Sequence, residues 1–351
     1  MKKFLAFLML ITGIANFSCA QQTTVTIGLV SGHSPAFLWV ELLRTTFRQE
    51  VEARLAGSGI RVEWREFFGG SLAPVGGELD ALGGGLAQIG VVPTLFNLNR
   101  LPIYGLTYYT PFGPGDPSLV AEAVAAVQSK TPAFREVLLR NGVIPLGGGF
   151  TLDSYQLMTT FPVRQFADLR GKRICAPGPA VTWLEGTGAV GIAGNLATYY
   201  QDLSTGACQG VIVFPTGALP ARLYEVARNV ILVNFGAQFA GLLGANSRWF
   251  EAQPEPLKRA LLAGAEKYAS EYARILKERA GVALTQMERG GASLIQVGDD
   301  FRQRWAFTMP NIAQRWANEL NRQGLPGTQV LSDYMTELRK RRVQLVRPWD
   351  R

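Results

Sequence analysis

Residues 61–92, RVEWREFFGGSLAPVGGELDALGGGLAQIGVV, set the fold class of this chain. Residues 61–68 alternate polar and apolar side chains, which predicts a β-strand. A helical segment containing Leu79 and Leu82 follows and stops at three consecutive glycines, and residues 88–92 form the short apolar run typical of a buried strand. A strand, a helix and a second strand in this order predict layered α/β structure.

The same order of elements continues along the chain. This pattern begins before residues 61–92 and restarts after the glycines at 147–149. The expected strands are at residues 24–30, 172–176 and 210–214, and the expected helices are at residues 179–184 and 199–203. A chain of 351 residues commonly divides in two. We therefore predict an α/β fold of two lobes, the first formed by residues 21–149 and 236–280 and the second by residues 150–235 and 281–351.

The longest predicted helix begins at Pro256. Apolar side chains recur at three- and four-residue steps from Leu257 to Leu276, so one stripe of the helix would be buried along its length. Such a helix is long enough to brace both lobes.

The N-terminus has the features of a secretory signal peptide at residues 1–20. Two lysines precede an apolar run at residues 4–15, which is too short to span a membrane. The small side chain of Ala20 predicts cleavage after it, which would leave a periplasmic mature chain. A lipoprotein acylated at Cys19 is the alternative.

Composition and charge exclude several classes of protein. Apolar residues make up 47% and charged residues 18% of the chain, which is typical of a globular protein with a full core. The basic run at residues 339–342 has no interleaved aromatic residues, so we expect no nucleic-acid partner. The glycines at 186, 188 and 191 follow a predicted helix instead of linking a strand to a helix, so we expect no dinucleotide cofactor.

The few residues suited to metal binding or nucleophilic catalysis are widely spaced. His33 is the only histidine, and with Cys175 and Cys208 far from it no ordinary zinc site can be written. A hydrolase would have to use His33 as its general base. An oxidising compartment permits a disulfide between the two cysteines, but their spacing does not decide whether it forms.

The chain resembles the solute-binding proteins of tripartite ATP-independent periplasmic (TRAP) transporters, of the DctP type. The segments that carry the resemblance are residues 69–73, 78–89, 162–163, 168–174, 176–179, 199–206 and 242–272. The resemblance implies two α/β lobes joined by crossing strands and the long helix, with the solute held in the cleft between them. It also implies lobe closure on binding and delivery to the membrane permease subunits of the transporter, without ATP.

The chain departs from that family where the family holds its ligand. Family members carry an arginine in a strand of the second lobe, where it pairs with the ligand carboxylate, and the matching residue here is Cys175. A second arginine near the start of that lobe is replaced by Gln156. Because a carboxylate buried without a partner is costly, binding of an acid by the usual arginine anchor cannot be assumed for this chain.

Three kinds of ligand therefore remain open. An anion could be held by backbone N–H groups at residues 177–179. A neutral or aromatic solute could lie against apolar walls, and a cationic group could meet Asp153 and Glu66. The residues we expect to bind the ligand are His33, Ser71, Thr94, Tyr155, Gln156, Cys175, Trp183, Phe214 and Phe235.

The sequence thus predicts a non-enzymatic, extracytoplasmic solute receptor of the TRAP type, with an organic acid as the expected solute. A receptor for an ATP-driven importer is the first alternative, and the path of the long helix would distinguish the two. A secreted hydrolase using His33 is the second.

Overall fold

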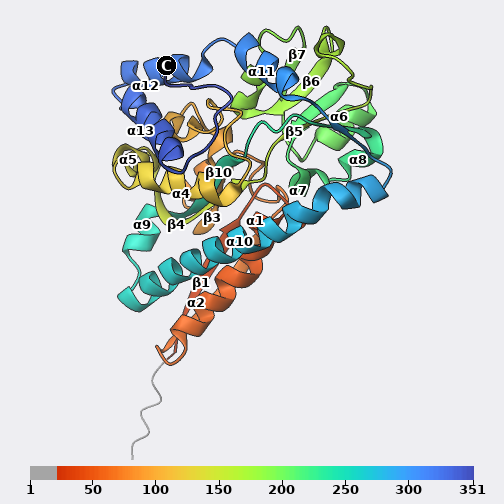
Figure 1. The fold of residues 1–351 in the computed structure, drawn as a ribbon. Helices are drawn as coiled ribbons and strands as arrows, with labels where there is room; N and C mark the ends of the chain where they lie inside the picture. The colour runs from red at the N-terminus through yellow and green to blue at the C-terminus, as the bar shows by residue number, and fades with distance from the viewer. Residues whose placement is uncertain (1–21) are drawn as a thin grey trace, which may run out of the picture.

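A computed structural model describes residues 22–351. The predicted signal peptide, its cleavage after Ala20 and the alternative acylation of Cys19 lie outside the described residues. Two β-sheets organise the described chain, with helices packed around them (Figure 1). Within residues 22–351, no helix combines the length and the apolar character needed to cross a membrane.

The first sheet has five strands in the order β2-β1-β3-β10-β4. β1 is parallel to β2 and β3, whereas β10 is antiparallel to β3 and β4. The segment 61–92 forms β2, α3 and β3, as its periodicity predicts. The bounds are Thr23–Val30 for β1, Ile60–Phe67 for β2, Glu78–Gly83 for α3, Ile89–Pro93 for β3, Val143–Leu152 for β4 and Gln238–Asn246 for β10.

The second sheet has six strands in the order β11-β9-β5-β8-β6-β7. β6 is parallel to β7 and β8, and β5 is antiparallel to β8 and β9. The antiparallel strands β5 and β10 are the ones that the chain enters directly after crossing from the other sheet. The bounds are Gln156–Thr159 for β5, Arg173–Pro177 for β6, Val190–Gly194 for β7, Gly210–Val213 for β8, Asn229–Leu232 for β9 and Ser293–Gln296 for β11.

Helices fill the connections between strands, and several begin at a residue suited to cap them. The Asp116 carboxylate accepts a hydrogen bond from the Ser118 N–H at 2.8 Å, for example, which caps α4. The remaining bounds are Leu38–Leu42 (α1), Leu43–Phe47 (a π-helical turn, η1), Arg48–Leu55 (α2), Thr94–Phe96 (η2), Pro102–Gly105 (η3), Pro117–Gln128 (α4), Ala133–Leu139 (α5), Phe166–Leu169 (η4), Gly178–Leu184 (η5), Tyr199–Ser204 (α6), Pro215–Ala218 (α7), Leu223–Val226 (α8) and Ser247–Glu251 (α9).

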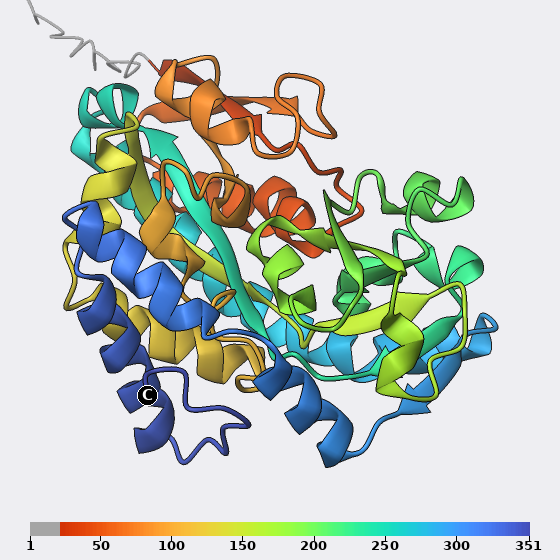
Figure 2. The ribbon, with the colours of Figure 1, turned by 90° about the horizontal axis from the view of Figure 1, so that it is seen from above.

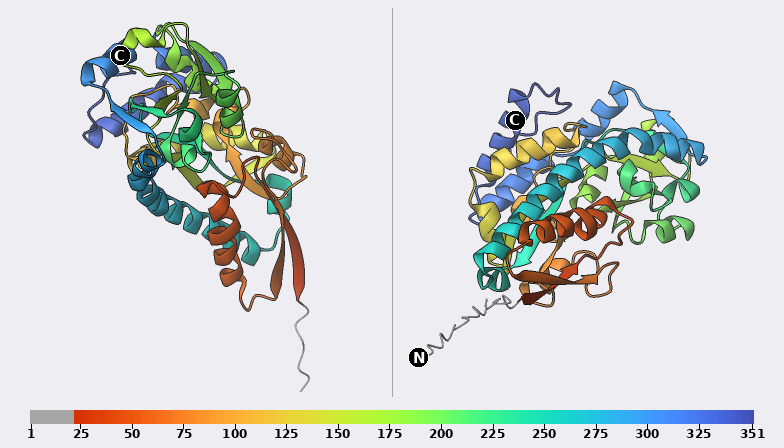
Figure 3. Two further views of the ribbon diagram at one scale, coloured as in Figure 1. Left: turned by 90° about the vertical axis from the view of Figure 1, so that its right-hand side faces the viewer. Right: turned by 90° about the horizontal axis from the view of Figure 1, so that it is seen from below.

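The predicted long helix is α10, Glu255–Arg289, with 35 residues. Its first half packs on α2 and β4, and its second half reaches α7 and β11 of the second sheet, so it runs along both halves of the molecule (Figure 3, right). Gly264 lets α10 approach α2 closely, because a Cβ atom there would lie 2.6 Å from Cγ2 of Val51. The long helix braces both sheets, as predicted.

The C-terminal helices divide between the two sheets. α11 (Asp299–Thr308) packs on the second, and Nε1 of Trp305 donates to the Trp183 carbonyl at 2.6 Å. α13 (Gly327–Lys340) packs instead on α4, and α12 (Ile312–Arg322) packs on α13 (Figure 2). Nε1 of Trp316, in α12, donates to the Pro102 carbonyl. The helices α12 and α13 therefore lie next to the first sheet, whereas the prediction assigns all of residues 281–351 to the second lobe. The lobe boundaries stay a prediction.

Besides α10 and the segment between α11 and α12, two extended connections carry the chain between the sheets, at residues 152–156 and 232–238. These two are hydrogen-bonded to each other. The Tyr155 N–H donates to the Gly236 carbonyl at 3.2 Å, and the Phe235 N–H donates to the Tyr155 carbonyl at 3.0 Å. The Gln156 side chain donates to Oδ1 of Asn234 and accepts from its N–H, at 2.8 and 2.9 Å. Asn234 has a φ of 54°, a conformation that asparagine tolerates better than most residues.

Cys175 and Cys208 form a disulfide, with their Cα atoms 5.8 Å apart. Cys175 lies in β6, and Cys208 lies just before β8, the strand that pairs with β6. The spacing of the cysteines alone does not decide whether they form a disulfide. They do so because the pairing of β6 with β8 brings them together.

Replacing Gln156 by alanine tests whether its side chain fixes the two connections. We expect the free energy of unfolding to fall by about 1–2 kcal/mol, because the buried Gln156 side chain loses both hydrogen bonds to the exposed Asn234. Urea denaturation followed by circular dichroism measures the change. Gln303→Ala, at an exposed helical position, is the control, and an equal effect of both substitutions would contradict the assignment.

Candidate functional site

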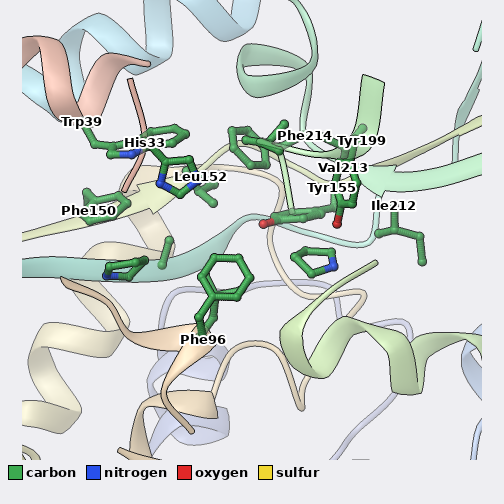
Figure 4. A pocket seen from close by; sticks show the side chains of 15 residues that line it. His33, Trp39, Phe96, Phe150, Leu152, Tyr155, Tyr199, Ile212, Val213 and Phe214 are labelled. Atoms are coloured by element: carbon green, nitrogen blue, oxygen red, sulfur yellow. The ribbon is translucent and has the colours of Figure 1, made fainter. Parts of the chain in front are cut away.

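A cavity lies between the two sheets, beside the paired connections (Figure 4). Its walls come from the ends of strands, from the connections and from the first turns of helices, which is where open α/β sheets commonly bind ligands. The lining residues are His33, Trp39, Pro93, Leu95, Phe96, Phe150, Leu152, Tyr155, Pro177, Leu196, Tyr199, Ile212, Val213, Phe214 and Ala240.

The cavity is small and its walls are mostly apolar. Its volume is about 30 Å³, which leaves room for only one or two water molecules. None of the lining residues, all within the described part of the chain, is an arginine, lysine, aspartate or glutamate. The polar side-chain atoms that the walls can offer come from the imidazole of His33, the phenol groups of Tyr155 and Tyr199 and the indole N–H of Trp39.

The segment that ends β1 is held in place by a buried carboxylate. Oε1 of Glu78, the first residue of α3, accepts from the Gly32 N–H at 2.7 Å, and Oε2 accepts from the Gly76 N–H at 2.7 Å. Burial raises the pKa of Glu78 to about 7. Gly32 is required here, because a Cβ atom would lie 2.3 Å from the Val75 nitrogen. These contacts fix the backbone next to His33.

His33 reaches the cavity as a neutral imidazole. It packs edge-on against Phe37 and Trp39, with ring centres 5.5 and 5.2 Å apart, and only 6% of its surface is exposed. This burial lowers the pKa of His33 to about 4. Nδ1 is buried and has no hydrogen-bond partner within residues 22–351. No carboxylate therefore orients the ring through that atom, as a hydrolase triad would require.

Two tyrosines provide further polar atoms of the walls. The hydroxyl groups of Tyr155 and Tyr108 share a hydrogen bond of 2.9 Å, so Tyr155 is partly satisfied. The Tyr199 hydroxyl is buried without a hydrogen-bond partner in the described chain, and burial holds its pKa well above the usual value. Tyr199 starts α6 and lies across the cavity from His33 in Figure 4.

Of the residues predicted to bind the ligand, His33, Tyr155 and Phe214 line the cavity. Trp183 and Phe235 are completely buried behind it and pack on each other, with ring centres 5.2 Å apart. Their part in binding, like that of the other predicted residues, stays a prediction.

The remaining four predicted residues lie outside the lining for different reasons. Gln156 bonds to Asn234, and Cys175 is bound in the disulfide. The Thr94 hydroxyl is buried and donates to the Ala240 carbonyl at 3.4 Å, whereas Ser71 is exposed. Each of these side chains is therefore turned to the fold or to solvent, not to the cavity.

The alternative of a cationic ligand finds no support in the walls, whereas the anion site at residues 177–179, where Pro177 lines the cavity, stays a prediction. Asp153 is buried and accepts from the Thr216 N–H and hydroxyl, which partly offsets the rise of its pKa to about 6 by burial. Glu66 pairs with Arg48 instead of facing the cavity. At residues 177–179, Gly178 packs so closely on the first lobe that a Cβ atom would lie 2.7 Å from the Leu95 carbonyl oxygen.

Several lining residues escape prediction from sequence. Trp39 looks like an ordinary core residue of an amphipathic helix, and Phe150 and Leu152 look like core residues of a strand. Tyr199 lies at the start of a predicted helix, which was the one usable signal, because helix starts that follow strands border the binding edge of α/β sheets.

The two mixed sheets, their paired connections, the long shared helix and the cavity define a two-lobed solute-binding protein. The chain belongs to family 7 of the bacterial extracellular solute-binding proteins, the DctP family. The sequence model of this family matches residues 31–319. This is a family of binding proteins, in agreement with the prediction of a receptor that is not an enzyme. No curated protein matches the sequence.

Solved structures of similar proteins share the fold at low sequence identity. The Bordetella pertussis extracytoplasmic solute receptor DctP7, which binds pyroglutamic acid, is 18% identical with a TM-score of 0.77, covering 88% of this chain and 99% of that one. A TRAP solute-binding protein from Bordetella bronchiseptica with bound (R)- and (S)-mandelate is 21% identical (TM-score 0.75; 90% and 99%). One from Shewanella oneidensis with bound succinate is 17% identical (TM-score 0.73; 90% and 99%).

The pKa of His33 gives a pH dependence that can be measured directly. Because His33 is the only histidine, one imidazole should titrate in NMR spectra, near pH 4 in the folded chain and near pH 6.5 in urea. Between these values the unfolded chain binds a proton that the folded chain does not. The free energy of unfolding should therefore fall as the pH drops from 6.5 to 4, by up to about 1.4 kcal/mol per unit.

His33→Gln is the reference for this measurement. Glu78 and Asp153, whose pKa values are raised, act in the opposite direction but are present in both proteins, so their effect cancels in the difference. The native chain should lose stability relative to the variant only below about pH 6.5. A folded-state titration near pH 6.5 would show that the imidazole is solvated.

Proposed function

We propose that the chain is an extracytoplasmic receptor of a TRAP-type secondary transporter. It captures a small organic solute in the cavity between its lobes and delivers it to the membrane permease subunits. The observation that carries this proposal is the cavity between two sheets that are joined by two paired connections and one long helix. Family membership supports it.

Lobe closure is part of the proposal, because the cavity is too small for a solute to enter as it stands. Contacts between the two sides would have to break, including the hydrogen bond from Nε1 of Trp183 to the Tyr108 carbonyl at 2.6 Å. The ion pair between Arg315 and Glu185, at 2.6 Å, would also have to break. A solute that touches both sides only when they are together would then shift the population toward the closed form.

We also propose which parts move together. The first lobe would consist of the first sheet with α12 and α13, and the second of the second sheet with α11. This division differs from the sequence-based boundaries at residues 312–351, because α13 contacts α4 and α12 packs on α13. The paired connections at 152–156 and 232–238 would serve as the hinge.

Two alternatives lose support from the contacts. The path of α10 along both sheets favours a TRAP receptor over one that serves an ATP-driven importer. A hydrolase would need a base oriented by an acid, and no carboxylate contacts Nδ1 of His33 among residues 22–351.

An organic acid is the class of solute that the sequence predicts and that the comparisons support. Pyroglutamate, mandelate and succinate are found in proteins with the same fold. In this chain such an acid would be bound without the usual arginine, because Cys175 is in a disulfide and Gln156 holds a connection.

Native mass spectrometry of the exported chain, purified without unfolding, tests the receptor function. We expect a retained molecule of low mass that is released when the chain is unfolded. Pyroglutamate, mandelate and succinate are then added to the emptied chain, and binding is followed by the change in unfolding temperature. Hydrolysis of ester or amide substrates by the native chain, lost in the His33→Gln variant, would instead identify a hydrolase.

Gly178→Ala tests closure. The added Cβ would meet the Leu95 carbonyl oxygen across the cleft, so the closed form should be destabilised, solute affinity should fall about tenfold or more and the radius of gyration in X-ray scattering should rise. Gly171→Ala is the matched control, since Gly171 also has a positive φ of 72° but has no atom within 4 Å of the added carbon. Identical behaviour of both variants would contradict the closure model.

A further inference from the structure

Two buried polar atoms of the cavity walls have no partner in the described chain, Nδ1 of His33 and Oη of Tyr199. Such atoms are rare in folded proteins, because losing water without gaining a hydrogen bond is costly. The other unpartnered atoms, on Gln128, Gln238 and Tyr272, belong to residues that do not line the cavity. Only these two unpartnered atoms belong to lining side chains, so they are the candidates for hydrogen bonds to a solute.

The two side chains come from different halves of the molecule. His33 follows β1 of the first sheet, whereas Tyr199 begins α6, which follows β7 of the second. Figure 4 shows them on opposite sides of the cavity. A solute that bonds to both would bridge the two halves only when they are closed, which is the differential contact that closure requires.

Aromatic side chains make up much of the wall between these two groups. Trp39 packs on Phe150 and Phe214, with ring centres 6.0 and 6.1 Å apart, and all three are nearly completely buried. Flat apolar walls of this kind fit a ring, through area burial and stacking. The shape of the walls thus favours an aromatic or alicyclic solute.

The same walls do not favour a charged solute. No lining residue carries a formal charge at neutral pH, since the histidine stays neutral. The one arginine of β6, Arg173, donates to the carbonyls of Gly206 and Ala207. A carboxylate in this cavity would lose its hydration without gaining a counter-charge.

We infer that the solute is uncharged: a small aromatic or alicyclic molecule with a hydrogen-bonding group at each end, such as a hydroxyl, carbonyl or amide, held by His33 and Tyr199. This inference rests on the proposed receptor function and names the class of its ligand.

A matched pair of probes tests the charge preference. 4-Hydroxybenzamide and 4-hydroxybenzoate have the same ring and the same hydroxyl group and differ in charge at neutral pH. Isothermal titration calorimetry of the emptied native chain should show that the amide binds about tenfold tighter or more. Equal or tighter binding of 4-hydroxybenzoate would overturn the inference.

Tyr199→Phe tests the hydrogen bond, because it removes only the unpartnered oxygen. We expect affinity for 4-hydroxybenzamide to fall about three- to tenfold, while the unfolding temperature of the empty chain stays the same or rises. A purely structural hydroxyl would not give this combination. Tyr334→Phe, a buried tyrosine of α13 away from the cavity, is the control and should leave affinity unchanged. Unchanged affinity of Tyr199→Phe would also overturn the inference.

The outcomes separate the inference from the receptor function. If 4-hydroxybenzoate or one of the acids binds and 4-hydroxybenzamide does not, the inference is wrong and the receptor function stands. If the purified chain retains no solute, and neither the two probes nor pyroglutamate, mandelate or succinate bind, both are wrong.

Discussion

The structure depends on the pairing of the two connections that join its sheets. Tyr155 exchanges backbone hydrogen bonds with Phe235 and Gly236, and Gln156 adds two more through its side chain. Because each connection satisfies polar groups of the other, neither can move independently. The proposed closure would therefore be a rotation about this pair. Tyr155 also lines the cavity, so the proposed hinge and the binding site share a residue.

A second constraint places the one histidine. Glu78 has both carboxylate oxygens in hydrogen bonds to backbone N–H groups, one from the segment after β1 and one from the glycine-rich loop before α3. Gly32 allows the two segments to touch. The glycines of residues 69–77, which carry part of the family resemblance, therefore contribute to the site by supporting His33, whereas the exposed Ser71 does not reach the cavity. Packing of loops, not a chemical motif, links this stretch of sequence to the site.

Periodicity predicted the elements well because it is a local property. The strand, helix and strand of residues 61–92 and the length of α10 follow from the spacing of apolar side chains along one segment. The antiparallel entry of β5 and β10 and the disulfide depend on which strands become neighbours, and spacing holds no such information. The cavity depends still more on which elements become neighbours, because Trp39, Phe150 and Tyr199 come from three distant segments of the sequence. The resemblance identified the position of the missing arginine, but not that Cys175 and Gln156 serve the fold.

The loss of that arginine changes what must drive closure. Shifting a two-state equilibrium from 1:99 to 99:1 requires about 5.5 kcal/mol of preference for one state. Without an ion pair, a ring that buries about 150 Å² of apolar surface contributes about 4 kcal/mol. Hydrogen bonds to His33 and Tyr199, at about 1 kcal/mol each, add a further 2 kcal/mol or so. In the proposed closure, apolar burial alone would therefore fall short, and hydrogen bonds to the two unpartnered groups would make up the difference. A ring without polar groups would then bind weakly and close the lobes incompletely, so the proposal makes recognition and closure depend on the same two side chains.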